Sequence, residues 1–398
     1  MKQGWEYKKL GEIGNIVTGS TPSTKDESNY SPREYCFVKP SDLPSQRIAL
    51  IEETEYYVSR KGLSQSRVLP TGSVLVSCIG SIGKIGILTK EACSNQQINA
   101  IIPKNDIDSK FIAYSIYAYR FLLESIANAP VVPIINKTDF SKIQIPIPPK
   151  STQLSIVSEL DKINELIRLK KEQLKDYDNL AQSIFYEMFG DPVENDKGWE
   201  VKKLGELCDK ISNGYNAKLE EDTYKSEGIM YFRCQNVWRN YFDYSDLVYI
   251  DEDTNQKMKS SSLKHNDFLI TKIGRINTEN SSLGRVSLYE GEDDKANLSG
   301  NLCFARLKKD AAVHKFILYI LISNQFRNYI RRTTVGGIDK RALNVRQISS
   351  FPIVSPPLPL QHLFAQRIEQ IEHQKSEVTK AITDLETLLA SRMQHWFE

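Results

Sequence analysis

Two short segments in the first half of the sequence could contact DNA: one is a row of side-chain amides, and the other is a lysine that follows two glycines. Asn95-Gln96-Gln97 puts side-chain amides in a row, and amides of this kind pair with adenine in the major groove of DNA. Lys84 follows Gly80–Gly83, whose glycine-flanked backbone amides suit the neighbourhood of a phosphate. Each cluster also fits a structural alternative, because loop amides often cap turns and glycines beside a solvated lysine are typical of a hairpin turn.

Basic and amide residues gather again in the second half. Tyr231–Asn236 alternates aromatic, arginine and amide side chains, a pattern that also describes a half-buried strand, and Phe37–Asp42 occupies the matching place earlier. The densest basic run lies between Arg327 and Arg346, where a solvated charged face is the alternative to a nucleic-acid contact. The corresponding stretch of the first half, Ile134–Lys142, has only two lysines, so the halves need not bind a nucleic acid equally tightly.

Motifs of known catalytic sites are missing from the sequence. No G-x-x-x-x-G-K-[ST] loop for ATP phosphates occurs, and neither Pro148-Pro149 nor Pro356-Pro357 forms an Asn/Asp-Pro-Pro-aromatic motif, because Ile147 and Ser355 precede them. The 5 histidines stand singly, and the 6 cysteines form no C-x-x-C pair, which argues against zinc and against a disulfide framework. We therefore expect a chain with no catalytic centre, metal or cofactor of its own.

Length and charge limit the class of protein. At 398 residues the chain exceeds the size at which one hydrophobic core keeps growing, so two or more domains are expected. The formal net charge is only +2, from 52 basic and 50 acidic residues, so any basic surface must be local. The longest apolar runs, such as Phe316–Ile322, are too short to cross a bilayer, and we expect a cytoplasmic protein without a membrane anchor.

The sequence contains an internal repeat. The offset between matching segments grows from 194 to 208 residues, so the copies differ in length inside each copy while their ends are kept. This pattern predicts two homologous modules with different recognition surfaces, although a duplication that merely drifted would look similar. The matching segments are Gly4–Glu12 with Gly198–Glu206, Lys110–Phe121 with Lys315–Phe326 (each an expected amphipathic helix), and Pro148–Gln153 with Pro356–Gln361.

A long helix is expected after each proline pair, since two prolines end the preceding strand. Apolar residues then repeat every 3.5 residues over more than four heptads, which predicts a coiled coil. At 1.5 Å per residue, the stretch from Ile156 to Met188 would be roughly 50 Å long. The alternative is two ordinary amphipathic helices, each packed on its own module. The predicted packing positions are Ile156, Leu160, Ile163, Ile167, Leu174, Phe364, Ile368, Ile371, Val378, Ile382 and Leu385.

The order of module, proline pair and helix, found twice, resembles the specificity subunits of type I restriction-modification systems over essentially the whole chain. The resemblance implies an α+β fold in which two homologous globular target recognition domains are separated by two long antiparallel coiled-coil helices, with an internal pseudo-two-fold repeat. It places the recognition domains at 1–150 and 191–358, and their spacer helices at 151–190 and 359–398. The residues that carry it are Trp5-Glu6 with Leu10-Gly11 and their repeats, Gly72–Ile87, Asn95–Gln97, and Pro148–Ile156 with its repeat.

By this resemblance, each domain reads one half of a split target in double-stranded DNA, and the helices set the gap between two grooves about one helical turn, about 34 Å, apart. The implied partners are methyltransferase subunits, in two copies, and an ATP-driven nuclease-translocase subunit. Those partners, and not this chain, would bind S-adenosylmethionine, ATP and Mg²⁺. The residues that we predict to contact DNA are Lys39, Ser41, Lys84, Gln96, Gln97, Lys137, Arg233, Gln235, Asn236, Lys272, Arg275, Arg331, Arg332, Lys340 and Arg341.

The second copy departs from the pattern at one place. Lys272–Arg275, followed by a longer insertion, stands where the first copy has Gly80–Lys84, so the contacts of the second half-site are less defined. Two other classes of protein remain as alternatives. One is a self-contained DNA methyltransferase or nuclease with its own recognition domains, against which the missing motifs argue. The other is a coiled-coil scaffold unrelated to DNA.

Overall fold

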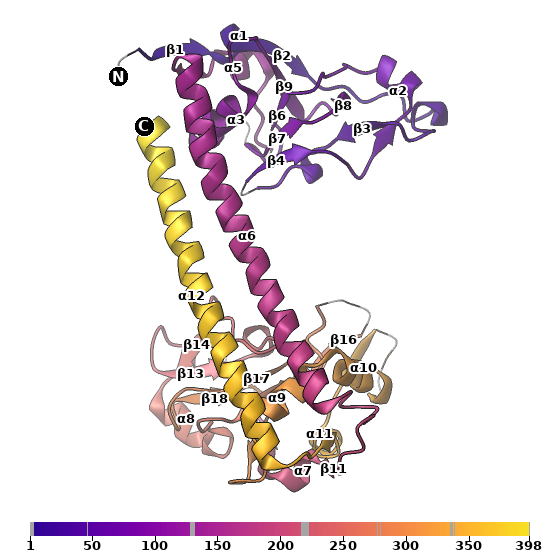
Figure 1. Cartoon of the computed structure of the whole chain (residues 1–398), viewed down its shortest axis with the longest axis vertical. Helices are drawn as coiled ribbons and strands as arrows, with labels where there is room; N and C mark the ends of the chain where they lie inside the picture. The colour runs from indigo at the N-terminus through magenta and orange to yellow at the C-terminus, as the bar shows by residue number, and fades with distance from the viewer. Residues whose placement is uncertain are drawn as a thin grey trace. The chain divides into compact units, whose positions relative to one another are not determined.

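A computed structural model describes residues 4–45, 47–127, 132–215, 223–276, 278, 280–334, 337 and 339–397. The chain forms two compact units, Met1–Lys171 with Lys380–Glu398, and Glu172–Thr379. Each unit contains one globular module together with part of the long helix α6 (Lys150–Phe189) and part of the long helix α12 (Leu358–Phe397). Helices and strands occur in both units, which confirms the predicted α+β class (Figure 1).

The module of the first unit is built on the five-stranded sheet β2-β9-β6-β7-β4, accompanied by the three-stranded sheet β5-β3-β8 and the pair β1-β10. Strand β6 buries both of its faces, because Val74 and Val76 belong to one hydrophobic cluster and Leu75 to another, and successive side chains of a strand point to opposite faces. The elements are β1 (Glu6–Lys9), α1 (Leu10–Ile13), β2 (Gly14–Thr18), η1 (Glu27–Asn29), β3 (Tyr35–Val38), η2 (Pro40–Asp42), β4 (Ile48–Ile51), β5 (Tyr57–Val58), α2 (Arg60–Ser64), β6 (Val74–Ser77), β7 (Ile85–Leu88), β8 (Ala92–Ser94), β9 (Ile98–Pro103), α3 (Ser109–Ala118), α4 (Arg120–Ile126), α5 (Lys137–Lys142) and β10 (Gln144–Ile147).

The module of the second unit repeats this plan. Its sheets are β12-β19-β15-β17, β14-β13-β18 and the pair β11-β21, and a further pair, β16-β20, borders the insertion. Strand β15 again buries both faces, with Phe268 and Ile270 in one cluster and Leu269 in another. The elements are β11 (Val201–Lys203), α7 (Leu204–Leu207), β12 (Cys208–Asn213), β13 (Ile229–Phe232), η4 (Cys234–Asn236), β14 (Val248–Ile250), α8 (Glu252–Lys257), η5 (Lys259–Ser261), β15 (Phe268–Thr271), β16 (Ile273–Arg275), β17 (Val286–Leu288), β18 (Ala296–Leu298), β19 (Leu302–Leu307), α9 (His314–Ile322), α10 (Asn324–Thr333), β20 (Lys340–Ala342), α11 (Val345–Ser349) and β21 (Pro352–Val354).

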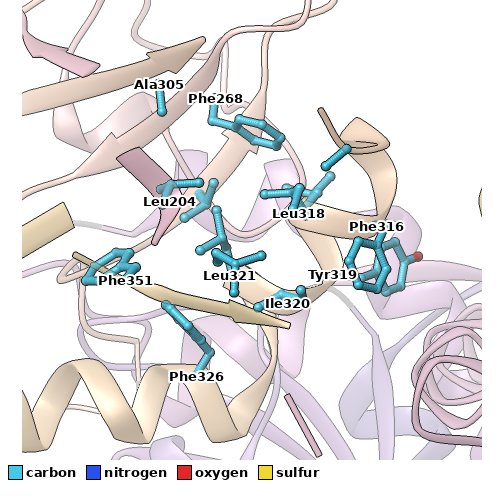
Figure 2. Packing of buried hydrophobic residues seen from close by; sticks show 14 of the residues in the cluster. Leu204, Phe268, Ala305, Phe316, Leu318, Tyr319, Ile320, Leu321, Phe326 and Phe351 are labelled. Atoms are coloured by element: carbon cyan, nitrogen blue, oxygen red, sulfur yellow. The ribbon is translucent and has the colours of Figure 1, made fainter. Parts of the chain in front are cut away.

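The core of each module contains one helix that is buried on most sides, α3 in the first module and α9 in the second. Figure 2 shows Phe268 of β15, Phe316 of α9 and Phe326 of α10 in the core of the second unit. In α3 six consecutive residues, Phe111 to Ile116, are buried, and α9 likewise buries Phe316 to Leu321. The predicted amphipathic character of these two helices is therefore wrong, because sheet and long helices cover them from several directions.

Each long helix has 40 residues and begins directly after its proline pair. Buried Gln153 holds this junction in the first unit: its Nε2 donates to the carbonyl of Pro148 at 3.0 Å, and its Oε1 accepts from the N–H of Asp108 at 2.9 Å. Gln361 does the same in the second unit with the carbonyl of Pro356 (2.8 Å) and the N–H of Val313 (2.9 Å). The repeated glutamines thus tie each long helix to the start of the buried helix in its module.

The two long helices pack against each other within each unit. In the first unit Glu159 pairs with Arg392, and Lys171 pairs with Glu386 at 2.7 Å. In the second unit Asp178 pairs with Lys375 at 2.5 Å. In the first unit the partner residue moves back along α12, from Arg392 to Glu386, as its position advances along α6 from Glu159 to Lys171, so the two helices are antiparallel there.

The predicted packing positions of the long helices are largely buried, and they contact both the modules and the partner helix. Nine of the eleven predicted positions are buried, while Leu174 and Leu385 are half-buried. Ile156 and Leu160 share a hydrophobic cluster with the first module and with Phe397 at the end of α12. Phe364, Ile368 and Ile371 share one with the second module. Each helix therefore packs on its own module as well as on its partner helix, which combines the two alternatives drawn from the sequence.

Aromatic contacts repeat at the ends of the long helices. Phe111 of α3 meets Phe397 with ring centroids 5.7 Å apart in the first unit, and Phe316 of α9 meets Phe189 at 4.7 Å in the second. The end of α12 is thus buried in the first module, and the end of α6 is buried in the second module. No helix in the described part of the chain is long and apolar enough to cross a bilayer.

Candidate nucleic-acid interface

A tight turn between β6 and β7 positions Lys84 in the first module. Gly80 and Gly83 have positive φ angles, +76° and +78°, which glycine adopts without strain. The Ser77 hydroxyl donates to the carbonyl of Ser81 and accepts from the N–H of Lys84 at 3.0 Å. The Lys84 Nζ donates to the carbonyl of Pro40 at 3.2 Å. The turn predicted at this place is present, and its lysine is half-buried.

The second module builds the same turn from Thr271 and Arg285. The Thr271 hydroxyl donates to the carbonyl of Ser282 and accepts from the N–H of Arg285 at 2.8 Å. The N–H of Gly284 (φ +68°) donates to the carbonyl of Thr271, as that of Gly83 does to the carbonyl of Ser77. Arg285 is therefore the counterpart of Lys84. The alignment of Lys84 with Lys272–Arg275 is wrong, because the insertion lies between Gly274 and Ser282 and shifts the register.

A second turn lies beside the first in both modules. The N–H of Cys78 donates to the carbonyl of Gln97 at 2.8 Å, and the N–H of Lys272 donates to the carbonyl of Asn301 at 3.0 Å. Gln96 is exposed and accepts from the Thr21 hydroxyl, whereas half-buried Gln97 accepts from the Asn95 amide. Of the two predicted glutamines, Gln96 is the one with its side chain at the surface.

Short 3-10 turns place the next group of candidates. In η2, the N–H of Lys39 donates to Asp42 at 2.8 Å, the Lys39 ammonium lies 3.1 Å from the centre of the Tyr56 ring, and Ser41 is exposed. In η4, the N–H of Arg233 donates to Asn236 at 2.9 Å. This matching geometry supports the correspondence of Phe37–Asp42 with Tyr231–Asn236.

Asp246 engages the polar residues of η4. Arg233 forms an ion pair with Asp246 at 3.3 Å, and exposed Gln235 donates to the same carboxylate at 3.1 Å. Asn236 is fully buried and donates to Asp246 at 2.8 Å. The place of Asn236 favours a structural role, since a base edge has no access to it.

The remaining predicted residues lie on the helices and strands that follow. Lys137 is exposed at the start of α5, and Arg332 is exposed near the end of α10. Arg275 faces Lys340 across the β16-β20 pair and forms an ion pair with Asp339 at 3.3 Å. Lys272 donates to Asn213 at 2.6 Å, and burial lowers the pKa of its ammonium.

Arg331 and Arg341 lie together. The Arg341 guanidinium donates to the carbonyl of Arg331 at 2.8 Å, and Arg331 donates to the carbonyl of Thr278 at 3.3 Å. These contacts bring α10 and β20 to the border of the insertion.

An open pocket lies at the turn in each module. In the first it has a volume of about 570 Å³ and includes Gly80–Lys84, Arg120, Phe121 and Glu124 in its lining. In the second it has a volume of about 420 Å³ and includes Arg275, Ser281, Ser282, Arg285 and Lys340. The two modules thus have a pocket at the same place of the fold, but the pocket of the first module is lined by basic and acidic side chains and that of the second by basic ones.

Comparison with known proteins identifies the family. The chain matches the family described as "Type I restriction modification DNA specificity domain" over residues 2–176 and again over 196–387. It belongs to this family. The two matches correspond to the two copies of the internal repeat, and the predicted resemblance is confirmed.

Several members of the specificity-subunit family resemble this chain along its whole length. It is 24% identical to the type I restriction enzyme MjaIX specificity subunit of Methanocaldococcus jannaschii, over 92% of this chain and 86% of that protein. It is 21% identical to the EcoKI specificity subunit of Escherichia coli K12, over 96% of this chain and 85% of that protein.

Solved structures show the same fold. The S subunit from M. genitalium matches with a TM-score of 0.56 and 12% identity, covering 99% of this chain and 96% of that one. A chain from a study of assembly and conformational transition of the type I system matches with a TM-score of 0.61 and 17% identity, covering 99% and 97%.

Some residues of this specificity subunit that line the turn were missed from the sequence. Arg285 had a readable signal, because Ser282-Leu283-Gly284-Arg285 repeats Ser81-Ile82-Gly83-Lys84. The supposed match of Phe121 with Phe326 misled, since Phe121 is exposed at 68% and Phe326 is fully buried. No sequence pattern predicts that Trp238 and Arg239 lie at the turn, because only the tertiary fold places their hairpin tip beside Arg285. The Arg285 guanidinium lies 3.8 Å from the centre of the Trp238 ring.

Metal and thiol chemistry find no support at this interface. Among the residues that the structure describes, no group of three or more His, Cys, Asp or Glu side chains could hold a metal ion. All six cysteines are free thiols, and five are buried. Burial raises the pKa of Cys78 and of Cys303 to about 12, so these thiols stay protonated and unreactive at neutral pH.

Proposed function

We propose that this DNA-specificity subunit recognises a split sequence in double-stranded DNA, with one half read by each module. The observation that carries the proposal is the paired turn: Ser77–Lys84 and Thr271–Arg285 share their hydrogen bonds, yet the side chains around them differ. A common framework with different lining side chains suits two readers of different base sequences, because phosphate contacts position a protein on DNA and base-edge contacts specify.

The long helices would serve as the spacer and as the docking face for partners. We propose that methyltransferase subunits, in two copies, and a nuclease-translocase subunit bind this chain, as the assembly named for one structural relative suggests. In this scheme the chain is not itself an enzyme. The partners hold S-adenosylmethionine, ATP and Mg²⁺, and this chain positions them on DNA.

The setting of this assembly would be the cytoplasm. Six free thiols suit a reducing compartment, where disulfides do not persist.

A module exchange tests the proposal. Residues 1–149 are replaced by the equivalent module of another specificity subunit, the hybrid is expressed with its methyltransferase partner, and methylated sites are mapped across a genome. Half of the methylated sequence should change, and the length of the unread gap should stay the same because α6 and α12 are kept. An unchanged motif would refute the assignment of one half-site to each module.

The same preparations discriminate the alternatives. The purified chain without partners should neither methylate nor cleave DNA. Methylation or cleavage by the lone chain would instead identify a self-contained enzyme, and a complex with no sequence preference would favour a scaffold.

A further inference from the structure

Four arginines gather beside the turn of the second module: Arg239, Arg285, Arg331 and Arg341. Arg285 is buried, and its guanidinium stacks on Trp238 while donating to the carbonyls of Ser281 and Asn280. Arg239 follows Trp238 and donates to the Asn324 amide oxygen of α10 at 3.5 Å. The links between Arg341, Arg331 and Thr278 complete a group that spans four separate segments.

The charges of these arginines repel one another, and no carboxylate among the described residues pairs with any of the four. In the described ranges, every hydrogen-bond partner of the four is a backbone carbonyl or an amide oxygen, and none forms an ion pair. Burial lowers the pKa of Arg239, and the charges of Arg331 and Arg285 lower it further. Grouped, partly desolvated cations of this kind are stabilised when an anion binds among them.

The first module lacks this group at the corresponding places. The η2 and η4 turns have the same hydrogen bonds, so the residues that follow them correspond. Trp238-Arg239 follows η4 and Val237, whereas Pro44-Ser45 follows η2 and Leu43, so Ser45 stands in the place of Arg239. The N–H of Gly80 donates to the carbonyl of Pro133, and the corresponding Gly274 pairs with Arg341 in the β16-β20 ladder. Pro133 therefore stands in the place of Arg341.

The helix beside the turn differs in charge as well. Leu123 and Ile330 are the buried helix residues nearest to Gly83 and Gly284, and the next residues are Glu124 and Arg331. The basic side chains at the turn of the first module are Lys84 and Arg120, and the acidic Glu124 lines the same pocket.

We propose that Arg239 and Arg331 form a binding site for a DNA backbone phosphate in the second module, so that this module anchors the subunit while the first contributes less to affinity. The proposal rests on the proposed function and adds to it an unequal division of labour. Arg239 and Arg331, both half-buried, supply N–H donors to the phosphate, because a guanidinium has five donors and few of theirs are used within the chain. Arg285 and Arg341 position them.

The test compares charge-neutralising variants in the complete complex with the methyltransferase partner. The double variant Arg239→Gln with Arg331→Gln removes the two half-buried guanidinium groups that would bind the phosphate. It keeps buried Arg285, which the fold needs. The matched control is Lys257→Gln with Lys259→Gln, which removes the same charge from exposed positions of the same module. Lys257 ends α8 and Lys259 begins η5 directly after it, and Figure 1 shows α8 on the opposite side of this unit from α10. Thermal unfolding and retention of the partner subunit establish that each variant is folded.

The readout is the affinity for a target duplex and for an unrelated duplex as a function of salt. A plot of log affinity against log salt should become shallower by about 0.9 in the arginine variant, the change expected for one lost phosphate contact, and should change little in the control. Both duplexes should lose affinity by the same factor, and the methylated sequence should be unchanged. An unaltered slope overturns the proposal, as does a loss confined to the target duplex, which would make the arginines base readers.

Neutral methylphosphonate linkages distinguish the two halves of the target. Replacing phosphates beside the half read by the second module should weaken the wild-type complex more than replacing those beside the other half. The arginine variant should show no such difference, and equal losses in the wild type would contradict unequal anchoring. A wild-type complex that prefers no sequence would instead refute the proposed function, so the two failures are distinguishable.

Discussion

Arg392 of α12 forms a two-pronged ion pair with Glu159 of α6. Its Nε donates to one carboxylate oxygen, its Nη2 donates to the other at 3.1 Å, and the Trp396 indole adds a third hydrogen bond at 2.9 Å. The pair lies within the first unit, where α12 returns to the module that begins the chain. It joins residues 233 positions apart in the sequence, so it forms only when both long helices are in place.

Replacing Arg392 with leucine should lower the free energy of unfolding modestly, because it removes a bidentate ion pair between two partly exposed side chains. The midpoint of urea unfolding, followed by far-ultraviolet circular dichroism, measures the loss. Lys171→Gln is the matched control, since its pair with Glu386 is more exposed and its loss should be smaller. Equal losses would mean that the geometry of the Glu159 pair carries no extra stability.

The same pair predicts a dependence of stability on pH. The hydrogen bond from Arg392, followed by that from Trp396, holds the pKa of Glu159 below its ordinary value of 4.5. A carboxylate with a lowered pKa in the folded state contributes stability that is present above pH 4.5 and lost as the pH falls below it. The difference in stability between wild type and Glu159→Gln should therefore shrink between about pH 5 and pH 3. A difference that stays constant over this range would show that the charge of Glu159 is not involved.

Removing the buried glutamine at either helix start should be costly. Gln153→Ala leaves the N–H of Asp108 and the carbonyl of Pro148 without their partner, and an unsatisfied buried group costs about 1–3 kcal/mol. Gln361→Ala should cost a similar amount, because its two hydrogen bonds are the same. Thermal unfolding measures both, with exposed Gln366→Ala as the control on α12. No loss at Gln153 would indicate that water replaces the amide.

The two glycines of the turns should tolerate alanine unequally. Both have positive φ, so each substitution costs about 1 kcal/mol of backbone strain. A Cβ at Gly83 would have its nearest neighbour at an ordinary 3.7 Å, whereas one at Gly284 would lie 2.7 Å from the buried Ile330 side chain. Gly284→Ala should therefore be the more destabilising change by thermal unfolding. The opposite order would mean that Ile330 moves aside without cost.

The sequence alone determined the repeated modules and the two long helices. Local patterns suffice for both, because matching segments fold alike and a seam such as Ile156, Leu160 and Ile163 dictates which helix face is buried. The glutamines after the proline pairs were visible as a repeat, although the hydrogen bonds that explain them were not.

Only the tertiary structure decided which residues share the surface at each turn. The equivalence of Lys84 and Arg285 depends on the hydrogen bonds of Ser77 and Thr271, since an insertion of several residues obscures the register in the sequence. Arg239, Arg331 and Arg341 come from segments far apart in the chain, and neither propensity nor periodicity encodes a contact at such separations. Packing of α10 and the 238–241 tip around Arg285 brings them together, so their combined charge is a property of the fold.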